Sequence, residues 1–343
     1  MLERYLKKVT VGEFLSTEEA YDLAKMLLHN EVPDIKAAAL LGAMRSRKES
    51  SAEILGFVKA IYEEAVKVET DLEVIDTCGT GGDGLSTFNI STAAALVVAS
   101  CGVPVAKHGN RAVTGKVGSA DILEGLGVNI NLKKDEALRI LEEIGITFFF
   151  APSYHPILKE VAPLRRSLGF PTIFNFLGPL LNPCPLTYQV MGIADNSMQA
   201  KIAEVLKKLG RKRAMVVNGE NGMDEISPVG KTKVCEIKDD LVYSYKVDAV
   251  ELGFHSISLD MLKGGDLKKN TAVFLSVLNG EYSPYRQAVA LNAAAALTVA
   301  EKAKSINEGL SMAYEAIDSG KAMNKLKEMI ALSRDGVNLC SIR

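Results

Sequence analysis

The sequence of 343 residues lacks the features that mark membrane, secreted and disulfide-rich proteins. It has no run of roughly 20 uninterrupted apolar residues, the length that a membrane-spanning helix needs. Its first residues, MLERYLKK, lack the apolar core of a signal peptide. The five cysteines are odd in number and contain no C-x-x-C pair, so neither a disulfide framework nor a zinc site is expected. We therefore predict a cytoplasmic protein with reduced thiols and no membrane partner.

An excess of positive charge is also absent. The formal net charge is −2, with 24% charged and 48% apolar residues, which is typical of a globular protein. Proteins whose main partner is a nucleic acid usually carry a basic field. We therefore predict no nucleic-acid partner.

A stretch rich in glycine, hydroxyl and amide residues runs from Asp76 to Thr92, DTCGTGGDGLSTFNIST. Glycine lets a backbone approach a ligand closely, and the hydroxyl and N–H groups are hydrogen-bond donors. The apolar run that follows predicts a helix beginning near Ser91, whose positive dipole end would point into the loop. These features together indicate a phosphate-binding site.

The loop fits two better-known phosphate motifs only in part. The G-x-G-x-x-G pattern from Gly79 to Gly84 would need an acidic residue roughly 20 positions later to hold a ribose, but no Asp or Glu occurs from Gly84 to Ala120. In a P-loop, a lysine would stand where Leu85 does. The acid-free segment carries basic residues instead: Lys107, His108, Arg111 and Lys116. This composition favours a ligand with several phosphates.

A second polar group, KHGNR at 107–111, follows a predicted strand. Ligands of open α/β sheets bind at the carboxyl ends of the strands, so this group is expected beside the glycine loop. Lys107 could hold phosphate oxygens, and Asn110 offers a donor and an acceptor to a second substrate. Ser119, at the start of a further helix, could donate to an anion. Taken alone, the segment could also be a solvated basic turn, which we regard as the less favoured interpretation.

Two further groups could carry chemistry. Asp224 and Glu225 follow the predicted strand 214–217, and adjacent carboxylates suit magnesium when substrate phosphates complete the shell. An isolated acidic pair is more often a solvated turn, but the phosphate loop favours the metal. Arg165 lies about three turns along the helix after His155, and a guanidinium can bind a carboxylate through two parallel hydrogen bonds. Cys78 is expected to pack rather than to act as a nucleophile.

The apolar patterns predict an α/β fold. Residues 1–70 contain only helical patterns, two of which open with capping boxes at Ser16–Glu19 and Ser50–Glu53. Strands and helices then alternate, which predicts a mostly parallel sheet covered by helices. The expected strands are 72–75, 103–106, 147–150, 188–193 and 214–217, with an antiparallel pair within 231–247. We predict a helical domain, 1–70, and an α/β domain, 71–343. The proline-rich segment 163–185 is expected to return to the helical domain.

Several long motifs in this order resemble those of the anthranilate phosphoribosyltransferases, from about residue 6 to about residue 332. They are DTCGTGGD at 76–83, NIST at 89–92, KHGNR at 107–111, GSAD at 118–121, RRSLG at 165–169, NFLGPLLNP at 175–183 and DEIS at 224–227. The resemblance implies a small helical domain joined to a large α/β domain of the nucleoside phosphorylase/phosphoribosyltransferase kind. It also implies a homodimer formed through the helical domain.

The implied reaction is the transfer of a phosphoribosyl group from 5-phosphoribosyl-1-pyrophosphate to anthranilate, with release of pyrophosphate, in tryptophan biosynthesis. The implied contacts of the diphosphate sugar are Gly79, Gly82, Asp83, Thr87, Asn89, Ile90, Ser91, Thr92, Lys107, His108, Gly109, Asn110, Arg111, Ala112, Val113, Thr114, Gly115 and Ser119. The implied magnesium ligands are Ser91, Asp224 and Glu225. The implied anthranilate contacts are Gly79, Asn110, His155, Arg165 and Gly178. The amine is already uncharged at neutral pH, so we expect positioning and electrostatics to carry catalysis, with no catalytic base.

One departure and two alternatives remain. Val117 stands where the resemblance leads us to expect serine, which removes one possible phosphate contact. A nucleoside phosphorylase would share this architecture, but it would not require the magnesium pair Asp224–Glu225. A non-catalytic nucleic-acid-binding relative of the same fold would need a basic groove, which the net charge of −2 disfavours.

Overall fold

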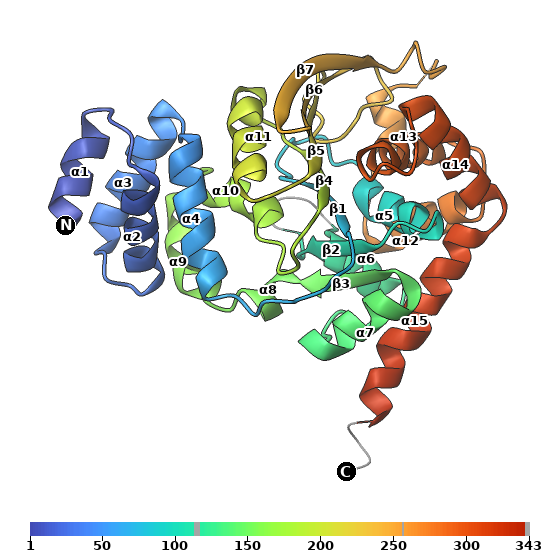
Figure 1. Cartoon of the computed structure of the whole chain (residues 1–343), viewed down its shortest axis with the longest axis horizontal. Coiled ribbons are helices and arrows are strands. Elements are labelled where there is room, and N and C mark those ends of the chain that lie inside the picture. The colour runs from blue at the N-terminus through green and yellow to red at the C-terminus, as the bar shows by residue number, and fades with distance from the viewer. Residues whose placement is uncertain (113–116, 256, 340–343) are drawn as a thin grey trace.

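A computed structural model describes residues 1–112, 117–255 and 257–339 (Figure 1). The chain begins with four helices, α1 (Leu2–Thr10), α2 (Thr17–Leu28), α3 (Asp34–Arg47) and α4 (Ser51–Glu63). Both predicted capping boxes are present. The Ser16 hydroxyl accepts from the Glu19 N–H at 3.2 Å, and the Glu19 carboxylate accepts from the Ser16 N–H at 3.0 Å. Ser50 and Glu53 repeat this arrangement at the start of α4, so local side-chain chemistry sets both helix starts.

Within the described part of the chain, seven strands form one sheet in the order β3-β2-β1-β4-β5-β6-β7. They are β1 (Ile75–Gly79), β2 (Val105–Gly109), β3 (Ile146–Phe150), β4 (Tyr188–Gly192), β5 (Arg213–Gly219), β6 (Lys231–Lys238) and β7 (Leu241–Asp248). The pairings among β1 to β5 are parallel, and β6 and β7 add an antiparallel edge. The β6–β7 turn is formed by Asp239 and Asp240, both with positive φ, as a tight hairpin requires.

Two predicted strand boundaries were wrong. We expected strands at 72–75 and 103–106, but β1 and β2 begin at Ile75 and Val105 and continue into the polar motifs. The reason is that polar residues of these strands, including Asp76 and Lys107, are buried. A pattern based on apolar runs therefore ends too early.

Helices cover both faces of the sheet (Figure 1). One face is covered mainly by α5 (Ile90–Ser100), α6 (Ser119–Gly125), α12 (Leu267–Leu278), α13 (Pro284–Val299), α14 (Ile306–Asp318) and α15 (Lys321–Leu339). The other packs on α11 (Gln199–Lys208) and the N-terminal helices. Along β5, Met215 and Val217 enter the first core, whereas Ala214 and Val216 enter the second. Burial on both faces explains the continuous apolar strands. No helix in the described ranges is long and apolar enough to span a membrane.

The segment after β3 runs beside the N-terminal helices (Figure 1). Helix α7 (Lys134–Ile144) precedes β3, and the segment itself forms α8 (Ala151–Tyr154), α9 (Leu158–Leu168) and α10 (Phe174–Leu177). Helix α9 contacts α2 and α3, and α10 contacts α4. The Phe174 ring meets the Phe57 ring edge to face, with centroids 5.7 Å apart. The same apolar core extends onto α11 and β5, so the division of the chain at residue 70 stays a prediction.

A strained residue ends α3. Lys48 has φ 63° and ψ 125°, a backbone conformation that a side chain disfavours and glycine tolerates. We expect Lys48→Gly to raise the free energy of unfolding by roughly 0.5–1 kcal/mol, as measured by urea denaturation. Lys48→Ala is the control, because it keeps the strain and removes the 2.6 Å contact between Lys48 Nζ and Ser197 Oγ. Equal stability of the glycine and alanine variants would contradict the prediction.

Candidate active site

The glycine loop begins where β1 ends, at the carboxyl edge of the sheet. Gly81, Gly82 and Gly84 have φ values of 66°, 78° and 73°, which residues with a side chain rarely adopt. Helix α5 begins at Ile90 with Asn89 as its cap, one residue before the predicted start at Ser91. Ser91 lies in the first turn of the helix, so the free N–H groups and the positive dipole end of α5 stand beside the loop.

The acidic pair lies against this loop because β1 and β4 both end in glycine. Gly79 and Gly192 are partners in the parallel register of the two strands. A Cβ atom on Gly79 would overlap the Asp224 carboxylate, and one on Gly192 would overlap the Asp224 backbone carbonyl. With both positions clear, Asp224 Oδ2 accepts a 2.6 Å hydrogen bond from the Gly81 N–H. The structure thus brings the acidic pair and the glycine loop together, and the assignment of the pair to a metal stays a prediction.

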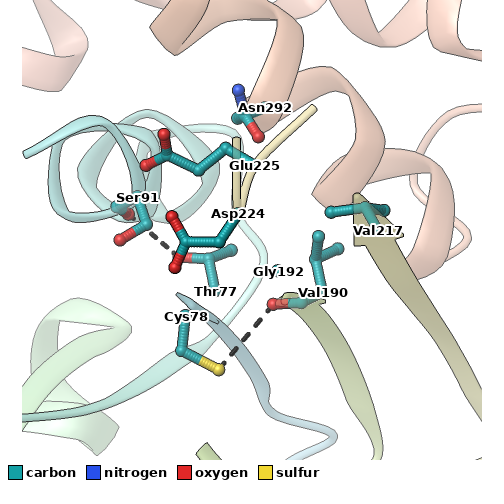
Figure 2. Close-up of a pocket in the computed structure, with 9 residues that line it drawn as sticks. All are labelled: Thr77, Cys78, Ser91, Val190, Gly192, Val217, Asp224, Glu225 and Asn292. Atoms are coloured by element: carbon teal, nitrogen blue, oxygen red, sulfur yellow. Dashed lines mark hydrogen bonds between the residues drawn. The ribbon is translucent and has the colours of Figure 1, made fainter. Parts of the chain in front are cut away.

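The oxygen atoms around this point suit a magnesium ion. Ser91, Asp224 and Glu225 line one small pocket together with Thr77 and Asn292 (Figure 2). Within the described residues, Glu225 Oε2 and Asp83 Oδ2 are buried and have no hydrogen-bond partner. Buried carboxylate oxygens without partners are costly unless a cation compensates them, and magnesium takes oxygen ligands.

Burial shapes the charge of this site. It raises the pKa of Asp224 to about 7, with the nearby Asp83 carboxylate as a second cause. Burial and the Asp224 charge raise the pKa of Glu225 well above its ordinary value. No group of three or more His, Cys, Asp or Glu arranged to hold a metal occurs in the described residues. Magnesium does not need one, because it binds through one or two carboxylates plus waters and substrate phosphates.

Lys107 lies beneath the loop rather than on its surface. The side chain is buried, and Nζ donates to the Thr77 carbonyl at 2.5 Å. Its charge opposes part of the rise that burial causes in the pKa of Asp76 and of Glu225. In this position the ammonium group contributes a positive field below the glycine loop.

The side chains at the start of α5 are mostly engaged by the protein. Asn89 Oδ1 accepts from Asn270 Nδ2 at 3.2 Å, and Asn89 Nδ2 donates to the Val117 carbonyl at 3.0 Å. Ile90 and Thr92 are buried. These residues can meet a ligand chiefly through backbone N–H groups. The Asn89 amide also ties the glycine loop to the segment before α6.

The second loop is closed by its own contacts. Arg111 pairs with Asp121 at 3.0 Å and with Glu124 at 2.7 Å, so its guanidinium already has two carboxylate partners. The Asp121 carboxylate also accepts from the Ala112 and Gly118 N–H groups. A Cβ atom on Gly109 would overlap the Ser119 hydroxyl, which donates to the Asn110 carbonyl at 3.3 Å. The predicted contacts Val113, Thr114 and Gly115 lie outside the described residues.

Two buried histidines meet at the ends of β2 and β3. The rings of His108 and His155 lie edge to face, with centroids 5.3 Å apart. His108 Nδ1 lies 3.2 Å from the Gly178 carbonyl, and His155 Nε2 lies 2.5 Å from the Leu181 carbonyl. A carbonyl can only accept, so these nitrogens carry the protons, and His108 Nε2 and His155 Nδ1 present lone pairs. Neither of these two atoms has a partner within the described residues. The structure therefore brings together His108, His155 and Gly178, three residues that the sequence suggested separately.

Arg165 is partly buried on α9, with its guanidinium carbon 5.5 Å from the centre of the Phe174 ring. No carboxylate pairs with it among the described residues, and burial lowers its pKa. The next residue, Arg166, is exposed. Arg165 is thus a partly buried cation available to an anionic ligand.

Cys78 has no nucleophilic character. Burial raises the pKa of its thiol far above neutral pH, and the sulfur accepts from Gln189 Nε2 at 3.4 Å. This agrees with the expected packing role.

Sequence reasoning missed a buried polar network below the site. Asp76 Oδ2 accepts from Asn182 Nδ2 at 2.9 Å, and Asn182 also donates to the Ala106 carbonyl at 2.7 Å. Gln189 Nε2 donates to the Pro179 carbonyl at 2.7 Å, and Arg211 Nε donates to Gln189 Oε1 at 3.0 Å. These bonds attach the 178–183 turn to β1, β2 and β4. The sequence signal that could have revealed this network is the presence of Asp76, Gln189 and Arg211 in or beside apolar strands.

Comparisons with known proteins agree with this architecture. Two family models match the chain, "Glycosyl transferase family, helical bundle domain" at residues 3–65 and "Glycosyl transferase family, a/b domain" at residues 71–323. The anthranilate phosphoribosyltransferase of Syntrophomonas wolfei is 59% identical over 99% of this chain and 100% of the relative. That of Bacillus mycoides is 44% identical over 97% of this chain and 98% of the relative.

Solved structures give the same result. The anthranilate phosphoribosyltransferase of Thermus thermophilus superposes with a TM-score of 0.90 at 40% identity, covering 96% of this chain and 99% of that one. The Saccharomyces cerevisiae enzyme in complex with PRPP and Mg gives 0.89 at 26% identity, covering 97% and 98%.

The fold and the site thus define a glycosyl transferase built from a helical bundle and an α/β sheet. Within that class, the chain belongs to the anthranilate phosphoribosyltransferase family. The fold class and the enzyme class predicted from sequence are confirmed.

The buried histidines predict a pH dependence of stability. Burial lowers the pKa of His108 to about 3 and that of His155 to about 4, both below the ordinary value of 6.5. At pH values between the lowered and the ordinary pKa, these two histidines bind more protons in the unfolded chain than in the folded one. We therefore expect the two neutral histidines to contribute fully to the free energy of unfolding above pH 6.5. This contribution should be lost progressively as the pH falls toward 4.

Urea denaturation at pH 7.5, 6 and 5 measures this effect. His155→Gln should reduce the dependence on pH relative to the unsubstituted protein. His29→Gln is the control, because His29 is exposed. The prediction is wrong if His155→Gln leaves the dependence unchanged.

Proposed function

We propose that the loops at the carboxyl edge of the sheet carry out the family's reaction, in the cytoplasm and with Mg²⁺. The 5-phosphoribosyl group passes from 5-phosphoribosyl-1-pyrophosphate to the amine of anthranilate, and pyrophosphate leaves. The observation that carries the proposal is the pair formed by the buried Asp224 and the partly buried Glu225, which faces a glycine loop at the start of α5. One carboxylate oxygen of this pair, Glu225 Oε2, is buried without a hydrogen-bond partner among the described residues. Such a pair suits a diphosphate that arrives with a metal ion.

The diphosphate sugar binds along the glycine loop and the start of α5. The left-handed glycines remove side chains from the path of the ligand, and the first N–H groups of α5 donate to phosphate oxygens. Lys107 adds positive charge from below. The proposed contacts are Gly79, Gly82, Asp83, Thr87, Asn89, Ile90, Ser91, Thr92, Lys107, Gly109, Asn110, Arg111, Ala112 and Ser119. Ile90 and Thr92 contribute through their backbone, because their side chains are buried.

Ser91, Asp224 and Glu225 hold the magnesium ion, which when bound neutralises charge that builds on the leaving pyrophosphate. The yeast relative was solved with both PRPP and Mg. In this chain, the Gly81 N–H fixes the Asp224 carboxylate at the mouth of the loop. The Asp224 carboxylate is therefore already in place when the substrate arrives.

The acceptor binds between the β2–β3 edge and α9. The lone pairs of His108 Nε2 and His155 Nδ1 suit an N–H donor, so they fit the amine end of anthranilate. Arg165 fits the carboxylate end, because a planar guanidinium can donate two parallel bonds. Gly79, Asn110 and Gly178 complete this subsite. The yeast relative was solved in complex with 4-fluoroanthranilate.

We propose in addition that two copies associate through the helical bundle. Large apolar side chains on this part of the chain face solvent, namely Met1, Val11, Phe14 and Ile35. Ile35 is 86% exposed, which is unusual for an isoleucine that meets only water. The proposal rests on these four exposed apolar side chains, which all belong to the helical part of the chain.

The metal pair gives the direct test of the activity. The unsubstituted protein should convert the two substrates to the phosphoribosyl product in the presence of Mg²⁺. Asp224→Asn combined with Glu225→Gln should abolish turnover while the circular dichroism spectrum stays unchanged. The matched control is Asp239→Asn with Asp240→Asn, which neutralises an adjacent acidic pair in the β6–β7 turn. Activity retained in the first double variant would remove the pair from the mechanism.

Arg165 gives the test of the acceptor. Arg165→Ala should raise the KM for anthranilate about 10- to 150-fold, the equivalent of roughly 1.5–3 kcal/mol for charged hydrogen bonds. The KM for the diphosphate sugar should hardly change, because separate loops bind it. Lysine at the same position should restore binding only in part, since it lacks the planar fork. Arg166→Ala is the control. Equal losses for both substrates would instead assign Arg165 a structural role.

A further inference from the structure

Helix α13 is apolar and alanine-rich, yet it carries two buried polar side chains, Asn292 and Thr298. The Thr298 hydroxyl donates to the Ala294 carbonyl one turn earlier in its own helix, at 2.8 Å. Asn292 also bonds within the helix, through Nδ2 to the Ala288 carbonyl at 2.9 Å. Only Asn292 of these two reaches out of α13, so it is the one that has a role beyond the helix.

The Asn292 amide clamps the backbone of Ile226, the residue directly after the acidic pair. Asn292 Oδ1 accepts from the Ile226 N–H at 3.0 Å, and Asn292 Nδ2 donates to the Ile226 carbonyl at 2.9 Å. Both bonds are buried. Figure 2 shows Asn292 next to Glu225 at the rim of the pocket that holds Asp224. The clamp therefore acts one peptide away from the carboxylates.

We propose that Asn292 is a positioning residue that holds the Asp224–Glu225 pair in the magnesium site. This inference rests on the proposed function, in which the pair binds the metal. According to this inference, the pair is kept in place by α13, through a residue that lies 66 positions after Ile226 in the sequence.

The forces on the pair explain why a clamp is needed. Two neighbouring carboxylates removed from water repel each other, and Glu225 Oε2 has no partner among the described residues. Local bonds fix the flanks of the segment. The Met223 N–H donates to Asn221 Oδ1 at 3.2 Å, and the Ser227 N–H donates to Thr232 Oγ1 at 2.9 Å. Between these flanks, Asn292 supplies the bonds to the backbone that follows Glu225.

The chemistry of the clamp requires a primary amide. Ile226 presents one donor and one acceptor, and an amide side chain carries both complements. Alanine at position 292 would leave a buried N–H and a buried C=O without partners, which costs more than the loss of an average hydrogen bond. The segment would relieve that cost by moving toward water, and the carboxylates would move with it.

The experiment compares Asn292→Ala with Thr298→Val, which removes a buried hydrogen bond from the same helix without touching Ile226. The first measurement is amide hydrogen exchange of the metal-free protein over residues 223–227. The second is Mn²⁺ binding in the presence of 5-phosphoribosyl-1-pyrophosphate, followed by the electron paramagnetic resonance signal of free Mn²⁺. Asn292→Ala should speed exchange in this segment and weaken Mn²⁺ binding about tenfold, because part of the binding free energy is then used to order the segment. Thr298→Val should do neither.

Steady-state kinetics add a third measurement. Asn292→Ala should raise the Mg²⁺ concentration needed for half-maximal rate and leave the KM for anthranilate unchanged. If Asn292→Ala does not fold, Asn292→Leu replaces it, because leucine fills the volume of the asparagine side chain and makes neither bond to Ile226; the same changes are then expected.

The proposal is overturned if Asn292→Ala binds Mn²⁺ like the unsubstituted protein, or if Thr298→Val produces the same loss. The combined Asp224→Asn and Glu225→Gln variant separates this failure from failure of the proposed function. If that variant also binds Mn²⁺ normally, the metal site itself has been misassigned. If only that variant loses binding, the metal site stands and Asn292 does not position it.

Discussion

The carboxyl ends of β1 and β4 have to be free of side chains for the acidic pair to reach the glycine loop. Gly79 and Gly192 stand opposite each other in the sheet, and Asp224 lies directly against both. This contact buries the Asp224 carboxylate beside the partly buried Glu225, and burial is the main cause of the raised pKa values of both groups. A site that disfavours its own negative charge gains most from a cation. Backbone clearance in two strands thus determines the electrostatics of the proposed magnesium site.

A second set of contacts fixes the acceptor side. The 178–183 turn is attached to the sheet by Asn182, Gln189 and the two histidines. In each of these bonds the acceptor is a backbone carbonyl of the turn or of the sheet, or the buried Asp76 carboxylate. Because Gly178 and Leu181 accept from the rings, the same bonds that hold the turn also select the tautomers of His108 and His155. Structural support and proposed ligand contacts therefore come from the same two rings, through opposite nitrogen atoms.

Sequence alone predicts those parts of this molecule whose causes are local. Capping boxes at Ser16 and Ser50 involve residues three apart, and the β6–β7 turn depends on Asp239 and Asp240. The meeting of the glycine loop with Asp224 follows from a general property of parallel sheets, whose strand ends share one edge. The residue-level ligand assignments stay predictions, and the structure gives several of those side chains protein partners, such as the carboxylates that pair with Arg111.

The features that sequence did not reveal depend on distant pairings. Asp76 and Asn182 are 106 residues apart, and Ile226 and Asn292 are 66 apart. Nothing in the neighbourhood of Asn292 distinguishes it from a tolerated polar residue in an apolar helix. The early ends predicted for β1 and β2 have the same origin, because only the folded packing shows that Asp76 and Lys107 are buried.

The core that joins α1–α4 to α9 and α10 has a consequence for synthesis on the ribosome. Phe57 and its apolar neighbours on α4 pack on Phe174, although α4 ends at Glu63 and α9 begins only at Leu158. At roughly 5–20 residues per second, the nascent bundle waits about 5–20 s for the helices that cover it. During that interval α4 presents an apolar face to solvent, and chaperones that bind such faces have a defined window in which to act. The order in which the chain emerges therefore leaves the first helices of this enzyme uncovered until the middle of the chain has been made.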